Sequence, residues 1–185
     1  HMSRDAEKQA EIYMRLGDLY DVHIPNADRA EASYQEILKR RPDDIPAREK
    51  LVALLTRTQS FSRAVEEQNV LVEGAGTPEM KCQRTIELAE ILEQMGENKK
   101  AENTLVAARK AYPKSDLALR ALVRFYQRTG QGPSAAVMLD RSVADARRAL
   151  STGRFEPYLF ETLWTAAELR GREDAASVAR ATVMA

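Results

Sequence analysis

The hydrophobic pattern of residues 88–113 predicts two consecutive α-helices joined by a tight turn. Apolar side chains recur at three- and four-residue spacing in two runs: Leu88, Ala89, Ile91, Leu92 and Met95, then Ala101, Leu105 and Ala108. Gly96 interrupts the pattern between the runs, and Pro113 ends the second one. The small side chains of Ala89 and Ala101 let two antiparallel helices approach closely. Such a hairpin cannot bury both its faces alone, so the pattern also predicts neighbouring hairpins.

The same arrangement recurs along most of the chain. An alanine marks the equivalent position of the second helix in five segments, at Ala30, Ala64, Ala101, Ala135 and Ala176. A turn glycine stands five residues earlier at Gly96, Gly130 and Gly171. Near the N-terminus, the spacing Tyr13-x-x-Leu16-Gly17-x-x-Tyr20 is followed by Ala30-x-x-x-Tyr34 and then by Pro42. This set of residues resembles the tetratricopeptide repeat (TPR), with one extra residue in the turn.

The TPR resemblance implies an all-α fold, a right-handed α-solenoid of antiparallel helix hairpins. We expect a single domain over residues 1–185, with repeats at about 10–43, 45–78, 82–115, 116–156 and 157–185. Repeats two, four and five are degenerate, because Val52, Val123 and Trp164 stand where the first helix of a standard repeat has glycine. The apolar and charged pattern of the fourth repeat continues to Gly153, which predicts a second helix two turns longer than usual.

Local signals place several helix ends. The first helix is expected over residues 5–22, with Ile12, Leu16, Leu19 and Tyr20 toward the core. The second repeat is expected to contain helices over 47–58 and 61–72, with Asp43 or Asp44 as its cap. The glycine-rich stretch 74–78 is interpreted as a connection in which Thr77 caps a helix that begins at Pro78. A phosphate-binding loop is disfavoured, because no Gly-Lys-Ser/Thr follows and no strand precedes it.

Charge and composition narrow the classes of partner. Lys and Arg number 28 and so do Asp and Glu, so the formal net charge is zero and no overall field attracts nucleic acid or an anionic membrane. The longest apolar runs fall short of a membrane span, so we expect no membrane insertion. Cys82 is the only cysteine, which excludes an internal disulfide and a cysteine-rich zinc site and favours a cytoplasmic location.

No residue pattern indicates catalysis, a metal site or a cofactor. Cys82 has no histidine near it in sequence, so it is interpreted as a helix-face residue rather than a nucleophile. Glu87, Glu90 and Glu93 follow each other at three-residue spacing, which is typical of a solvated helix face. We therefore expect a protein that is not an enzyme and has no cofactor.

The TPR resemblance implies instead a groove, lined mainly by the first helix of each hairpin, that binds segments of other proteins. The groove candidates for partner binding are Arg120, Arg124, Arg128, Arg57, Glu90, Glu93, Asp18 and Tyr158. Arg120, Arg124 and Arg128 stand on consecutive turns of one predicted helix, which suits recognition of carboxylates and predicts an acidic partner segment. The alternative is that Glu90 and Glu93 of the preceding repeat neutralise these arginines.

The leading functional hypothesis is a scaffold or adaptor that binds a protein or peptide in this groove. The alternative is a structural module that self-assembles through its last helix, where Val178, Val183 and Met184 are the interface candidates. That helix ends without a polar cap, so we expect either a longer native chain or a homo-oligomer formed through this end. A nucleic-acid-binding repeat ranks last, because only the fourth repeat carries a basic stripe.

Overall fold

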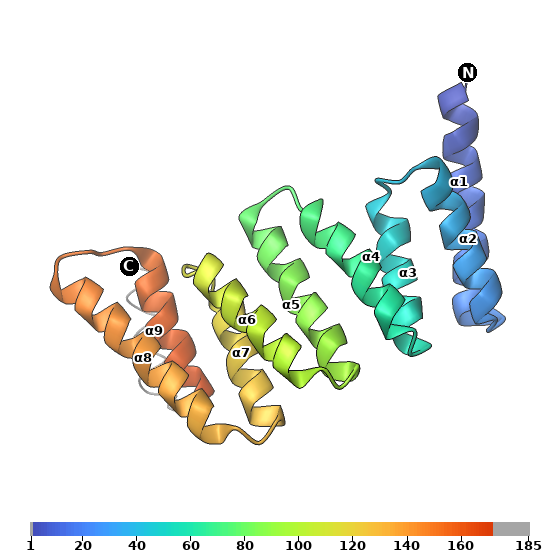
Figure 1. The fold of residues 1–185 in the computed structure, drawn as a ribbon. Coiled ribbons are helices and arrows are strands. Elements are labelled where there is room, and N and C mark those ends of the chain that lie inside the picture. The colour runs from blue at the N-terminus through green and yellow to red at the C-terminus, as the bar shows by residue number, and fades with distance from the viewer. Residues whose placement is uncertain (1, 172–185) are drawn as a thin grey trace. The chain divides into compact units, whose positions relative to one another are not determined.

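The computed structural model describes residues 2–171, and its side chains from residue 7 onward (Figure 1). Over this range the chain forms helices and no strand. The helices are α1 (Met2–Asp18), the π-helix η1 (Leu19–His23), α2 (Ala27–Arg40), α3 (Ile45–Arg57), α4 (Phe61–Glu73), α5 (Pro78–Gln94), α6 (Asn98–Ala111), α7 (Asp116–Arg128), α8 (Gly132–Ser151) and α9 (Pro157–Leu169). The chain divides into two compact units, residues 1–101 and 102–185.

Within the units, successive helices pack as hairpins: α1 on α2, α3 on α4, and α7 on α8. Hairpins then stack through α2 against α3 and α4 against α5 in the first unit, and through α9 against α7 and α8 in the second. The expected helices of the second repeat are confirmed within two residues at each end. The prolonged second helix of the fourth repeat is confirmed as the 20-residue α8.

The repeated alanine is buried at each of the described positions. Ala30, Ala64 and Ala101 are completely buried and Ala135 is 5% exposed, whereas Ala176 falls outside the described residues. In the first hairpin, Gly17 lies against Tyr34, and a Cβ added at Gly17 would overlap the buried Tyr34 ring. The separation of α1 and α2 therefore requires glycine at this position.

The extra residue of the first repeat is absorbed in a π-helix. The amide of Ile24 donates to the carbonyl of Leu19 at 2.8 Å, which is the i→i+5 bond of that geometry. The helix predicted over residues 5–22 is thus α1 followed by η1. One detail of that prediction is wrong, because Ile12 is 58% exposed. Ala10 and Gly17 turn toward the core instead, which places Ile12 on the opposite side of the helix.

Left-handed residues end the first helices of the hairpins. Gly96, Gly130 and Gly171 have φ angles of 85°, 73° and 68°. Gln59 occupies the equivalent position of the second repeat with φ of 61°, and it is the only non-glycine residue of the described chain with positive φ. A side chain in this conformation carries a steric cost that glycine avoids.

The predicted caps are confirmed in the second and third repeats. The Asp44 side chain accepts from the amide of Ala47 at 3.0 Å. Thr77 accepts from the amide of Met80 at 3.1 Å, and Pro78 begins α5. The stretch 74–78 is therefore a helix connection, as its composition predicted.

The Gly17→Ala variant tests the close approach of α1 and α2. Because the new methyl group would overlap the Tyr34 ring, we expect a loss of about 1–3 kcal/mol in the free energy of unfolding, measured with urea. Gly132→Ala is the matched control, since a Cβ at Gly132 meets no atom within 4 Å and its φ is not positive. Equal stability of the two variants would contradict the packing described here.

Gln59→Gly is expected to stabilise the protein. Glycine removes the steric cost of the left-handed conformation, and its greater freedom in the unfolded chain offsets part of that gain, which leaves about 0.5–1 kcal/mol. The reverse change, Gly130→Gln, should destabilise by a similar amount. Thermal unfolding of both variants measures this, and a Gln59→Gly protein that melts below the parent would refute it.

Candidate functional site

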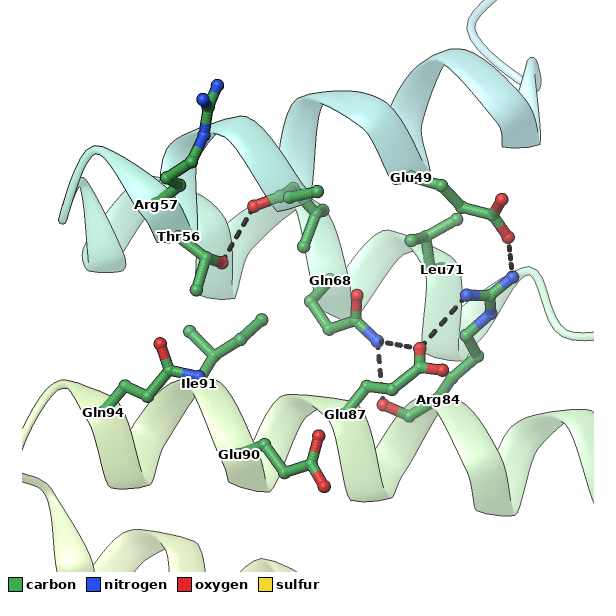
Figure 2. A pocket seen from close by; sticks show the side chains of 12 residues that line it. Glu49, Thr56, Arg57, Gln68, Leu71, Arg84, Glu87, Glu90, Ile91 and Gln94 are labelled. Carbon is green, nitrogen blue, oxygen red and sulfur yellow. Dashed lines mark hydrogen bonds and ion pairs between the residues drawn. The ribbon is translucent and has the colours of Figure 1, made fainter. Parts of the chain in front are cut away.

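A pocket of about 590 Å³ lies between the first helices of the second and third repeats, over the second helix that connects them (Figure 2). Three helices supply its lining. These residues are Glu49, Val52, Ala53, Thr56 and Arg57 from α3, Gln68 and Leu71 from α4, and Arg84, Glu87, Glu90, Ile91 and Gln94 from α5. All of them belong to the first compact unit.

The pocket has an apolar base and a polar rim. Val52, Leu71 and Ile91 are each at least nine-tenths buried, and Ala53 adds an exposed methyl group beside them. Charged side chains of α3 and α5 surround this base. The arrangement suits a ligand that combines apolar contacts with hydrogen bonds, as a peptide segment does.

Gln68 is a buried amide that joins α4 to α5. Its side chain is only 1% exposed, and its Nε2 donates to the Arg84 carbonyl at 2.9 Å and to Oε2 of Glu87 at 3.1 Å. A buried amide is costly unless it is hydrogen-bonded, so these two bonds fix the spacing of the two helices. The same bonds orient the Glu87 carboxylate at the pocket edge, as Figure 2 shows.

Arg84 connects the two walls of the pocket. Its guanidinium pairs with Glu49 of α3 and with Glu87 of its own helix, the latter at 3.1 Å. Burial lowers the pKa of Arg84, but the hydrogen bonds to Glu49 and Glu87 outweigh it and hold the pKa above its ordinary value. Arg84 is therefore a permanent cation that bridges successive repeats (Figure 2).

Similar pairs connect the first repeat to the second. Arg57 pairs with Asp21 of η1, and Lys50 pairs with Asp18 of α1 at 2.9 Å. Asp18 also accepts from the hydroxyl of Tyr34 at 3.0 Å. Burial raises the pKa of Asp18, but the hydrogen bonds from Lys50 and Tyr34 outweigh it, so the pKa lies below its ordinary value.

In the second unit, Arg120 makes the corresponding contact between first helices. Its guanidinium binds Asp116 of α7 at 2.9 Å, and it reaches Glu168 and the buried Thr165 of α9 at 2.9 and 3.1 Å. The side chain is 18% exposed and lies over the Trp164 ring. Arg120 therefore holds α9 on α7, and its charge is already compensated inside this unit.

The other predicted site residues lie in different settings. Arg57 and Glu90 line the pocket, whereas Glu93 and Asp18 are partly buried outside its lining. Arg124 and Arg128 are exposed on α7. Tyr158 of α9 stacks beneath Lys114, whose ammonium nitrogen lies 5.2 Å from the ring centroid. The interface candidates Val178, Val183 and Met184 lie outside the described residues.

The polar pocket residues that the sequence did not predict include Gln68, Glu87 and Arg84. Gln68 interrupts the apolar stripe Ala64, Val65 and Leu71, and a polar residue in such a stripe is the signal that could have identified it. Glu87 was interpreted as part of a solvated face, yet it is partly buried and accepts three hydrogen bonds. Arg84 carried no signal of its own, because its partner Glu49 lies 35 residues away.

The described residues contain neither a metal-binding cluster nor a membrane-spanning helix. Over the described part of the chain, no group of three or more His, Cys, Asp or Glu side chains is placed to hold a metal ion. Over the same residues, no helix combines the length and the apolarity that crossing a membrane requires.

Arg120→Ala is expected to destabilise the second unit by about 1–2 kcal/mol, a value reduced for the partial exposure of Asp116 and Glu168. Arg124→Ala, which removes an exposed arginine from the same helix, is the control and should change stability by less than about 0.5 kcal/mol. Urea unfolding followed by circular dichroism measures both. Equal effects would show that the Arg120 contacts carry no stability.

The loss of folding stability caused by Arg120→Ala should depend on pH. Arg120 donates to Glu168 and holds the pKa of that carboxyl below its ordinary value of 4.5. A lowered folded-state pKa contributes stability above the unfolded value, and this contribution is lost as the pH falls through the folded value. The stability difference between parent and Arg120→Ala should therefore be full at neutral pH and shrink below pH 4.5.

Comparison with known proteins shows the fold. No family model matches the sequence, and neither does any curated protein. Among solved structures, the MamA protein is 18% identical with a TM-score of 0.52, over 96% of this chain and 91% of its own. BtubC from P. vanneervenii is 19% identical with a TM-score of 0.52, over 98% of this chain and 87% of its own.

A third similar structure is described as having TPR-like repeats. It is a putative kinesin light chain of Podosopora anserina with nearly identical TPR-like repeats, 18% identical with a TM-score of 0.51, over all of this chain and 95% of its own. At such identities the likeness concerns the fold alone. The expected all-α fold of antiparallel helix hairpins is thereby confirmed, and the chain has the fold of TPR-like repeat proteins.

Proposed function

We propose that this protein is a non-enzymatic scaffold that binds a segment of a partner protein in the pocket between α3 and α5. The observation that carries the proposal is the pocket itself, about 590 Å³ with an apolar base and a charged rim. Its volume lies within the range of specific binding sites, about 300–1,000 Å³. The fold shared with TPR-like repeats supports the same class of function.

The pocket favours an extended segment with both apolar and polar side chains. Val52, Leu71 and Ile91 offer apolar contacts in the base. Glu90 places a carboxylate on the α5 wall, whereas Arg57 on the α3 wall is already paired with Asp21. A segment that carries a basic side chain beside an aliphatic residue would complement Glu90 and the apolar base, and charge pairing of this kind sets orientation more than affinity.

In the second unit, the arginines of α7 support a separate contact with an acidic partner segment. Arg120 is engaged by Asp116 and Glu168, so its role in this proposal is structural. Arg124, exposed one turn further along α7, is the arginine that we assign to carboxylate recognition. An acidic partner segment is therefore still proposed, but Arg124 rather than Arg120 is the residue that binds it.

Filling the pocket should abolish partner binding. Ala53→Trp introduces a large side chain on the α3 wall, at an exposed helix position that makes no hydrogen bond through its side chain. Ala32→Trp on α2 is the matched control, because it places the same side chain on an exposed helix position away from the pocket. Circular dichroism should show unchanged helical content in both variants.

The measurement is quantitative affinity capture from native lysate with the parent and both variants. Specific partners should be retained by the parent and by Ala32→Trp, and reduced at least about tenfold with Ala53→Trp. Partners captured equally by all three proteins would place the binding surface elsewhere. A photo-crosslinking residue at Gln94, which lies on the pocket edge in Figure 2, should label the same partners.

A further inference from the structure

The two compact units carry opposite net charges that the overall balance conceals. Residues 1–101 contain 15 Lys and Arg against 19 Asp and Glu, whereas residues 102–185 contain 13 against 9. The first unit is therefore acidic and the second basic, each by four charges. Because the whole chain has no net charge, copies of it do not repel each other at long range.

The excess positive charge of the second unit gathers on one exposed face of α8. Val137, Arg141, Ala144 and Arg148 are all exposed and follow each other at helical spacing, with Arg147 beside them. None of these three arginines forms an ion pair or a side-chain hydrogen bond with another described residue. Asp145 offsets one of the three charges, so this face, termed the α8 face, is doubly positive.

A face of α4 in the first unit has the opposite character. Ser62, Glu66, Asn69 and Glu73 are exposed at the same spacing, and Val70 next to them is 45% exposed. Glu66 and Glu73 form no ion pair within the described part of the chain. Their basic neighbour Arg63 is already bound to Glu31 at 2.6 Å. This face, termed the α4 face, is doubly negative.

The two faces match in spacing as well as in charge. Arg141 and Arg148 are seven residues apart, and so are Glu66 and Glu73, which places each pair about 10 Å apart along its helix. Val137, which is 67% exposed, and Val70 add an apolar contact at each surface. Arginine is the side chain best suited to hold a carboxylate across an interface, because its planar guanidinium donates in a fixed fork.

We propose that the α8 face of one copy binds the α4 face of a second copy. Arg141 and Arg148 pair with Glu66 and Glu73, and Val137 and Val70 are partly covered. Because the two faces differ, the contact is heterologous, and association through it increases with concentration. The contact does not use the α3–α5 pocket.

The test is sedimentation velocity of the purified chain and its charge-reversed variants at about 50 mM and about 500 mM salt, since exposed ion pairs are screened over this range. The parent should self-associate at low salt, and its oligomers should dissociate at high salt. Arg141→Glu with Arg148→Glu should raise the dissociation constant at least about tenfold, and so should Glu66→Arg with Glu73→Arg. In a mixture of these two variants, the native α8 face of one can pair with the native α4 face of the other, and the two reversed faces are also opposite in charge. The mixture should therefore associate again.

A matched control separates this contact from a change in net charge. Lys8→Glu with Lys110→Glu alters the net charge as much as the α8 variant does, at exposed residues outside both faces, and should leave association unchanged. The proposal is overturned if the parent is monomeric at low salt at about 500 µM, a concentration at which even weak contacts are populated. It is also overturned if the control dissociates like the α8 variant, or if the mixed variants stay apart.

Discussion

The closest approach between two helices of a hairpin is the constraint on which the rest of this structure depends. Gly17 lies against the Tyr34 ring, and Ala30 beside it is completely buried. Helices that approach this closely exclude water from their seam and leave their outer sides to the next hairpin, so the stack follows from the seam. The conformations that end the first helices, from Gln59 to Gly171, serve the same packing because they return the chain at the required spacing.

Ion pairs between first helices add a second layer of order to this packing. Three such pairs join successive repeats in the first unit: Asp18 with Lys50, Asp21 with Arg57, and Glu49 with Arg84. In the second unit, Arg120 pairs with Glu168 in the same way. Each pair is partly exposed, so its contribution to stability is small beside that of the buried apolar residues. Its main effect is to orient charged side chains in the region where a partner would bind. The pocket between α3 and α5 therefore presents fixed rather than mobile charges.

The sequence predicted the fold well because the fold rests on local signals. A buried alanine, a turn glycine and a proline each act on their own helix ends, so Ala64, Gly130 and Pro78 could be interpreted without knowledge of their neighbours. The π-helix was visible only as one extra residue in the repeat. Its geometry depends on how η1 must reach the start of α2, which no local pattern contains.

The site was harder to predict because its contacts join residues far apart in the chain. Arg120 was expected to face a partner, yet it is held by Glu168, which lies 48 residues away. Arg84 and Glu49 are likewise invisible to any analysis of one helix at a time. In a repeat stack, a charged residue on a first helix always has two candidates for neutralisation, the next repeat and a partner protein. The spacing of charged residues along one helix is the same in the two cases, so it cannot distinguish them.

That competition gives a physical basis for separating structural from binding residues in this protein. A charge already bound across a repeat, such as Arg84, loses one contact for each contact it gains with a partner, so it adds little net affinity. Exposed charges without such a contact in the described chain, such as Arg124 and Arg141, lose only water when a carboxylate approaches. This argument supports the binding roles proposed for Arg124 and Arg141 over such roles for the arginines that join repeats.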